Sequence, residues 1–205
     1  HGAEFNLGLH NYSGNTYSPN GHKYIREFEW NKIPTTIFRV GGINLKKEKV
    51  FQHFENRILI RYTLLEAHSV TTLRLRPFLA FRSVNSCTHE NGMVNRHYDE
   101  VNNVIKPRMY DGYPELYMQL NKKNEFKFEP NWYKGVEYQR EQELGYEYTE
   151  DLYVPGYFEF NIKKGESIVF AAGVKEVKTR GLKKTFEEEM DERTPRDNFQ
   201  HCLVN

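Results

Sequence analysis

The sequence has no long apolar run and few cysteines. None of its hydrophobic stretches approaches the roughly 20 residues that a membrane-spanning helix needs, and no signal-peptide pattern opens the chain. Its 205 residues include two cysteines, Cys87 and Cys202, too few for the disulfide framework of a small secreted domain. We therefore expect a soluble, cytoplasmic protein with free thiols.

The sequence also has no excess of charge of either sign. Its 29 Lys and Arg residues balance 28 Asp and Glu residues, which leaves a formal net charge of +1. Because a near-neutral chain creates no strong overall field, it is not drawn to polyanions or to anionic lipid surfaces. We expect neither a nucleic acid nor a membrane as partner.

Several recurrent catalytic and cofactor motifs are missing. The chain contains no G-x-G-x-x-G, P-loop, G-x-S-x-G or H-E-x-x-H motif, so it lacks the usual parts of nucleotide sites, serine hydrolases and zinc proteases. Cys87, His89 and His97 lie close in sequence, but their spacing matches no recurrent zinc pattern and a fourth ligand is not evident. We predict no metal and no cofactor.

What the sequence does contain is a series of short strand patterns rich in aromatic residues. Aromatic residues make up 15% of the chain, and turn signals recur about every ten residues, as in antiparallel all-β proteins. The predicted strands span residues 23–30, 35–40, 43–54, 57–66, 70–82, 104–109, 115–120, 125–129, 132–139, 157–162 and 167–174. We expect the last two to form a hairpin, and residues 1–22 and 83–99 to be loops.

The predicted strand over residues 70–82 changes character along its length. Alternate residues share a face of a strand, and one face here is apolar throughout. That face carries Leu73, Leu75, Pro77, Leu79 and Phe81. The other face begins with two arginines and becomes apolar at Phe78 and Ala80. We therefore expect another layer of the protein to cover Phe78 and Ala80.

The end of the chain has a different pattern. Residues 183–193 are charged and compatible with a helix, Pro195 interrupts, and residues 198–204 allow a second helix. We predict one β-domain over residues 1–182, followed by a helical linker over residues 183–205.

Two groups of side chains are candidates for carbohydrate chemistry. The densest run of carboxylates consists of Glu141, Glu143, Glu147, Glu150 and Asp151. Glycoside hydrolysis needs two carboxyl groups across a scissile bond, yet charge clusters of this kind more often form a solvated surface. Trp30, Trp132 and Tyr133 could stack on sugar rings, although aromatic residues in β-sandwiches mostly fill the core.

Four segments, taken in order, resemble the N-terminal domain of bacterial and archaeal glycogen debranching enzymes. They are "GHKYIREFEWNKIPTTIFRVGGINLKKEKVFQHFENRILIRYTLL", "LRLRPFLAFR", "WYKGVEYQREQELGYEYTEDLYVPGYF" and "KKGES". The resemblance covers nearly the whole chain. It implies a large antiparallel β-sandwich of the supersandwich type, followed by an (α/α)₆ barrel with amylo-α-1,6-glucosidase activity. Because that barrel lies outside this chain, no catalytic residue is assigned here.

The sequence departs from the family pattern at one place. Family members often continue Phe-Arg with Asp-Tyr-His, whereas Ser83, Val84 and Asn85 follow Arg82 in this chain. The departure falls in the predicted loop over residues 83–99.

The resemblance implies a non-catalytic domain that shapes or binds α-glucan, such as glycogen or maltodextrin, beside its own C-terminal catalytic domain. Arginine, carboxylate and imidazole groups bind vicinal hydroxyls, while rings stack on sugars. The candidate glucan-binding residues are His22, Arg76, Arg82, Trp132, Tyr133, Glu150 and Asp151. The alternative is a purely structural or oligomerisation domain, with a homodimer as the expected assembly. A self-sufficient enzyme depends on the carboxylate run alone and is the weakest hypothesis.

Overall fold

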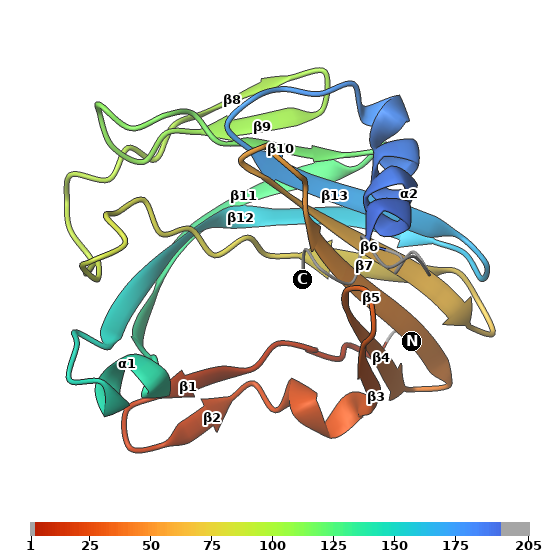
Figure 1. Ribbon diagram of the computed structural model, residues 1–205, viewed down its shortest axis with the longest axis horizontal. Coiled ribbons are helices and arrows are strands. Elements are labelled where there is room, and N and C mark those ends of the chain that lie inside the picture. The colour runs from red at the N-terminus through yellow and green to blue at the C-terminus, as the bar shows by residue number, and fades with distance from the viewer. Residues whose placement is uncertain (1–2, 194–205) are drawn as a thin grey trace, which may run out of the picture.

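The computed structural model describes residues 3–193, and its strands form two antiparallel sheets packed face to face (Figure 1). The eight-stranded sheet has the spatial order β3 (Ile25–Trp30), β4 (Pro34–Val40), β5 (Ile43–Phe51), β6 (Arg57–Glu66), β13 (Ser167–Gly173), β10 (Tyr117–Leu120), β9 (Val104–Pro107) and β8 (Tyr98–Val101). The five-stranded sheet has the order β2 (Thr16–Ser18), β1 (His10–Tyr12), β11 (Glu125–Glu137), β12 (Thr149–Ile162) and β7 (Thr71–Leu75). The prediction of an all-β sandwich is confirmed.

The main core lies between the two sheets. Phe158 of β12 meets Phe170 of β13 edge to face across it, with ring centroids 5.6 Å apart. Alternation explains the arrangement: Phe158 and Phe160 point inward from one sheet, while Ile168 and Phe170 point inward from the other. The sandwich is therefore held by the apolar face of each sheet.

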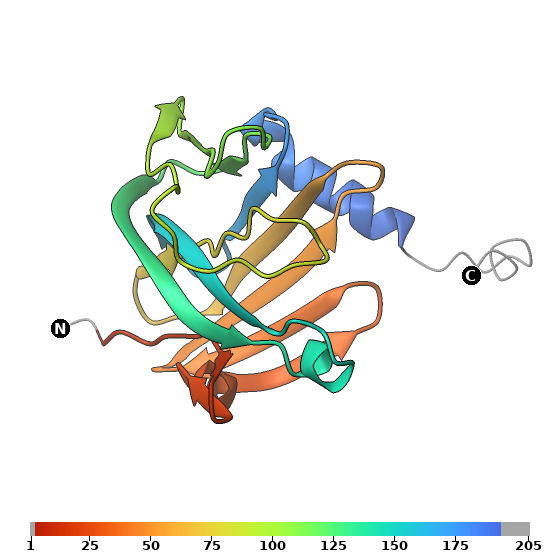
Figure 2. The same cartoon turned by 90° about the vertical axis from the view of Figure 1, so that its left-hand side faces the viewer.

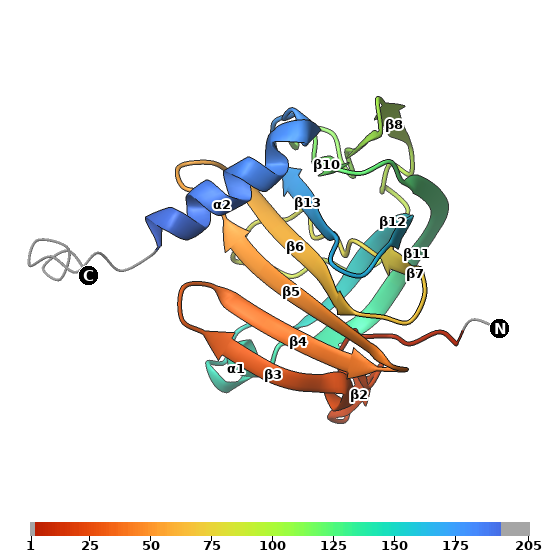
Figure 3. The same cartoon turned by 90° about the vertical axis from the view of Figure 1, so that its right-hand side faces the viewer.

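A second, smaller core lies on the outer face of the eight-stranded sheet, under α2 (Leu182–Glu192) (Figure 3). Leu182 and Phe186 of α2 are buried against Leu59 of β6 and Val169 of β13. The helix predicted over residues 183–193 is thus present and packed on the sheet. The helix predicted over residues 198–204 lies outside the described residues.

The prediction that residues 157–174 form a hairpin is wrong. β12 pairs with β11 and β7 in one sheet, whereas β13 pairs with β6 and β10 in the other. The turn between them crosses from sheet to sheet, and it is fastened to β6 because Gly165 N donates to Leu64 O and Leu64 N donates to Glu166 O. The cause is burial: in a hairpin Phe158 and Phe170 would lie in one sheet, but here they face each other across the core.

Other boundaries also differ from the prediction. The strands β1 and β2 lie in the opening segment expected to be a loop, and β12 begins at Thr149, eight residues before the predicted start. The two strands predicted over residues 125–139 are a single strand, β11, with two bulges. The short helix α1 (Gln139–Glu143) was not predicted. Several of these elements are positioned by distant partners, as Tyr12 opposite Val136 shows.

The segment over residues 70–82 is a strand only as far as Leu75. Pro77, which has no N–H for the ladder, follows the end of β7, and the chain touches β12 again only at the isolated pair Leu79–Tyr153. Phe78 is half-buried, as expected for a covered residue, but Ala80 is exposed, so the prediction of a covering layer is wrong there. No helix among residues 3–193 is long and apolar enough to cross a membrane.

Candidate functional site

The rim loop, which we define as residues 76–97, runs beside the first half of β12 (Figure 2). Leu79 N donates to Tyr153 O over 2.8 Å, and Tyr153 N donates to Leu79 O over 3.2 Å. Farther along, Asp151 N donates to Thr88 O over 2.7 Å. The loop therefore follows β12 without forming a regular strand, and it brings its polar side chains to the start of that strand.

Glu150 is the centre of this region, and its side chain has no exposed surface. Arg82 donates to both carboxylate oxygens, from Nε to Oε1 and from Nη2 to Oε2, the latter over 3.2 Å. Tyr138 Oη donates to Oε2, and the backbone N–H of Thr88 donates to Oε1 over 3.2 Å. Because a buried charge is tolerated only when it is paired and hydrogen-bonded, Glu150 joins the rim loop to the ends of β11 and β12.

The electrostatics of the cluster fix the protonation of its neighbours. Burial, together with the hydrogen bond to Glu150, raises the pKa of the Tyr138 hydroxyl, so this group stays a neutral donor. The hydrogen bond to Glu150 raises the pKa of Arg82. Burial raises the pKa of the Cys87 thiol, and the negative charges of Glu150 and Glu147 raise it further. Since the thiolate is the reactive form of cysteine, this shift disfavours Cys87 as a nucleophile.

Asp151 is bound to different partners from Glu150. Its Oδ2 accepts the N–H of Glu90 and its Oδ1 accepts the N–H of Gly135, each over 2.8 Å. His89 lies between Asp151 and Glu147, with Nδ1 3.8 Å from Asp151 Oδ2 and Nε2 3.4 Å from Glu147 Oε1. The hydrogen bond from the Cys87 backbone N–H lowers the pKa of Glu147. The hydrogen bond from His89 lowers it further. This second group of side chains is more open to solvent.

The arrangement fixes the loop and does not resemble a hydrolytic pair. Glu150 and Asp151 are neighbours on a strand, so their side chains point to opposite faces, whereas glycosidases place two carboxyl groups across a scissile bond. Both carboxylates are already occupied by donors from the protein. Among residues 3–193, no group of three or more His, Cys, Asp or Glu side chains is placed to hold a metal ion.

The predicted aromatic residues lie in different environments. Trp132 is only 7% exposed and packs on Tyr153, with ring centroids 5.3 Å apart, so its ring is part of the core. Its indole N–H is buried without a hydrogen-bond partner in the structure. Tyr133 is half-buried and packs against Phe78, with ring centroids 4.5 Å apart. Phe78 in turn stacks on His10, again with ring centroids 4.5 Å apart. These contacts are the layer that covers Phe78.

We define the rim cluster as Arg82, His89, Tyr138, Glu147, Glu150 and Asp151. The remaining predicted residues are not part of it. The guanidinium of Arg76 lies 4.7 Å from the ring centroid of Tyr157 and pairs with Glu129 over 3.4 Å. His22 is exposed in a 3-10 turn and lines a hollow of about 190 Å³ with Leu9 and Tyr17. Of the seven predicted residues, the structure joins Arg82 and Glu150 directly and places Asp151 beside them.

Sequence reasoning missed part of this cluster. Tyr138 carries no motif, and the donors from Thr88, Glu90 and Gly135 are backbone groups that any residue except proline supplies. From the sequence, His89 is a candidate only for metal binding. The nearest sequence signal was the run of carboxylates that includes Glu147.

Comparison with known proteins gives the context for this geometry. A family described as "Glycogen debranching enzyme N terminal" matches residues 1–169. The chain belongs to this family. Among solved structures, a bacterial glucoamylase complexed with acarbose is similar, with a TM-score of 0.42 and 9% sequence identity. The match covers 90% of this chain and 30% of the glucoamylase chain. No curated protein sequence matches the chain.

Proposed function

We propose that this chain is a non-catalytic β-sandwich domain of a glycogen-debranching glycoside hydrolase, which helps to shape or bind α-1,4- and α-1,6-linked glucan in the cytoplasm. The observation that carries the proposal is the match to the glycogen debranching enzyme N-terminal family over residues 1–169. The occupied carboxylates of Glu150 and Asp151 support a role without catalysis in this chain.

The rim cluster gives the proposed role a physical basis. Because Glu150 and Trp132 are buried, we assign them to positioning the rim loop and β11. Arg82, Asp151 and Tyr133 are half-buried and retain atoms at the surface, where guanidinium, carboxylate and phenol groups can bind sugar hydroxyls. Arg76 and His22 would contact more distant parts of a long glucan.

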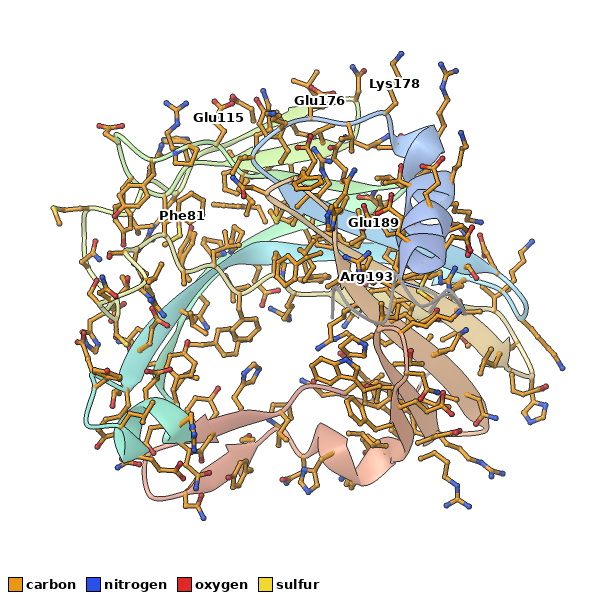
Figure 4. All side chains as sticks on the ribbon, in the orientation of Figure 1. Phe81, Glu115, Glu176, Lys178, Glu189 and Arg193 are labelled. Carbon is orange, nitrogen blue, oxygen red and sulfur yellow. The ribbon has the colours of Figure 1, made fainter. Side chains whose placement is uncertain are left out.

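The proposed partner is a C-terminal (α/α)₆ catalytic domain, reached through a helical linker over residues 183–205. The described part of this segment is fastened to the sandwich at α2 (Figure 4). Glu189 accepts the N–H of His53 over 3.0 Å, and Arg193 donates to Glu189 Oε2 over 2.6 Å and to Phe51 O over 2.7 Å. The proposed linker is therefore held against the sandwich as far as Arg193.

The experiment is a calorimetric titration of the chain with maltooligosaccharides. We expect binding to the wild type, and at least fivefold weaker binding for Asp151→Asn, which replaces a half-buried carboxylate by a neutral amide that accepts sugar hydroxyls less strongly. Lys164→Ala, an exposed change in the turn between β12 and β13, is the control and is expected to bind as the wild type does. No binding, together with unchanged activity of the full-length enzyme when His22, Arg82, Trp132 and Glu150 are changed, would leave a scaffolding role only.

The alternative is a structural or oligomerisation domain. The observation that favours it is β3, an edge strand whose six residues are all exposed, because an open edge can pair with another chain. Light scattering that showed a dimer independent of sugar, combined with a silent titration, would support this alternative.

A further inference from the structure

The inner face of the eight-stranded sheet continues beyond the region that the five-stranded sheet covers. One row of paired residues crosses it in the order Ile168, Tyr62, Lys47, Thr36 and Phe28, on β13, β6, β5, β4 and β3. Ile168 and Tyr62 belong to the main core, whereas Phe28 is 58% exposed. The same face thus changes from core to open surface as it approaches β3.

We define the open platform as Phe28, Trp30, Thr36, Lys47 and Lys49. Trp30 follows Phe28 by two residues and is 72% exposed, and Lys49 follows Lys47 by two residues, so all share the inner face. Along β3 the two ring-bearing positions lie roughly 7 Å apart, and the lysines of β5 lie two strands away, roughly 10 Å to the side. The helix α2 lies on the outer face and does not cover this surface (Figure 3).

The lysines of the platform lack acidic partners. Within residues 3–193, neither Lys47 nor Lys49 forms an ion pair with a carboxylate, whereas their neighbour Lys46 pairs with Glu48 on the outer face. The ammonium of Lys47 lies 5.8 Å from the ring centroid of Tyr62. Burial, followed by the charge of Lys49, lowers the pKa of Lys47. Both groups therefore have donor capacity that the protein does not use in an ion pair.

We propose that the open platform is a binding surface for a linear, neutral α-glucan chain. The inference rests on the proposed function, since it takes a glucan as the ligand. Two rings in line on one strand suit a polymer whose units present an apolar C–H face again and again. The ammonium group of the exposed Lys49 can donate to hydroxyl oxygens at the edge of such a chain, and a few polar groups beside an apolar surface are typical of ligand sites.

Two other occupants fit the platform less well. A second copy of the chain pairing along β3 would bring together the carboxylates of Glu27 and Glu29, and charges on an edge strand oppose such pairing. An acidic protein segment would satisfy the lysines but has no need for two aligned rings. A neutral glucan uses both features.

The chain has two tryptophans, which makes the test direct. Trp30 is exposed and Trp132 is buried, so Trp132→Phe leaves Trp30 as the sole indole reporter. On titration with maltoheptaose we expect the emission of Trp30 to move to shorter wavelength and its quenching by iodide to fall.

In calorimetry, Trp30→Ala is expected to weaken maltoheptaose binding at least tenfold. Phe54→Ala, which removes a 98% exposed ring from the β5–β6 turn, is the matched control and is expected to bind as the wild type does.

The outcomes separate this inference from the proposed function. If the wild type binds maltoheptaose but Trp30→Ala binds equally well, the platform is excluded while a glucan-binding domain stands. If no glucan binds to any variant, the inference fails and so does the binding role of the proposed function; the activity of the full-length variants then decides whether more than a scaffolding role is left. Circular dichroism of Trp132→Phe and Trp30→Ala checks that each is folded. A sugar-independent shift in Trp30 emission that accompanies dimerisation, or binding of poly-glutamate that high salt abolishes in the absence of maltoheptaose binding, would overturn the inference.

Discussion

Arg82 and Glu150, 68 residues apart in sequence, form a charge pair in which the carboxylate is completely buried and the guanidinium reaches the surface. The pair connects the rim loop to the start of β12, at a place where the backbone pairing is irregular. Because the loop has no regular ladder of its own, this contact helps to fix its position, together with the backbone hydrogen bonds that Leu79 and Thr88 form with β12.

The first prediction concerns the loss of Arg82. Arg82→Met removes the only cation that contacts Glu150 among residues 3–193 and leaves Tyr138 and the Thr88 backbone to solvate a buried carboxylate. Breaking one side of a buried pair costs about 3–5 kcal/mol. We expect a loss of this size in the free energy of unfolding, measured by urea denaturation at pH 7.

The matched control for Arg82 is Arg74, which pairs with Glu4 and Glu159 at the surface. Arg74→Met is expected to leave the urea midpoint nearly unchanged, because exposed ion pairs contribute little. The double variant Arg82→Met/Glu150→Leu should recover much of the loss, since it removes the isolated charge. An unchanged urea midpoint for Arg82→Met would show that Glu150 does not depend on its partner.

The second prediction concerns acid stability and Glu48. This buried carboxylate accepts hydrogen bonds from Arg61 Nε and Nη2 over 2.7 and 2.9 Å, and Lys46 Nζ lies 3.2 Å away. Burial alone would raise the pKa of Glu48, but Arg61 and Lys46 outweigh burial and hold it below its usual range. Its contribution to stability is therefore present above the unfolded pKa, about 4.3, and is lost as the pH falls through the folded pKa.

Urea denaturation between pH 6 and pH 3 checks this prediction. We expect the unfolding free energy of the wild type to fall with decreasing pH, and that of Glu48→Gln to be lower at pH 6 but to fall less steeply. Glu188→Gln, at an exposed pair with Lys184, should follow the wild-type curve. Parallel curves for the wild type and Glu48→Gln would show that Glu48 titrates alike in the folded and unfolded chains.

The limits of sequence reasoning follow from which contacts are local. The strand predicted over residues 57–66 is β6 as observed, because its alternation and flanking turns lie within the segment. The segment over residues 157–174 has equally clear strands, yet nothing local distinguishes a hairpin from a crossing between sheets. β1 is three residues long and is held by pairing with distant Val136, so its own sequence carried no signal.

The candidate site shows the same limit. Arg82, Glu150 and Asp151 could be predicted because charged groups within an apolar strand pattern need partners. Trp132 is a candidate for sugar stacking in the sequence, but in the structure it lies opposite Tyr153 and its ring packs in the core. Trp132 is in step with Phe126, which packs on the same core six positions earlier in β11, but alternation alone does not say which face of a strand is covered.

The third prediction tests the first bulge of β11 at Gly156, which pairs with Phe128 beside that bulge. A Cβ at position 156 would lie 2.1 Å from Lys127 O and 3.0 Å from Glu129 N, and φ at this residue is 156°. Both atoms belong to the backbone of the paired strand, so no side-chain rotation can relieve the contact. We expect Gly156→Ala to lower the free energy of unfolding by at least about 2 kcal/mol, within the range for disruptive single substitutions. Gly145→Ala is the control: its φ is 77° and no atom lies within 4 Å, so only the backbone strain of about 1 kcal/mol remains. Equal urea midpoints for the two variants would show that the two sheet strands do not approach closely at Gly156.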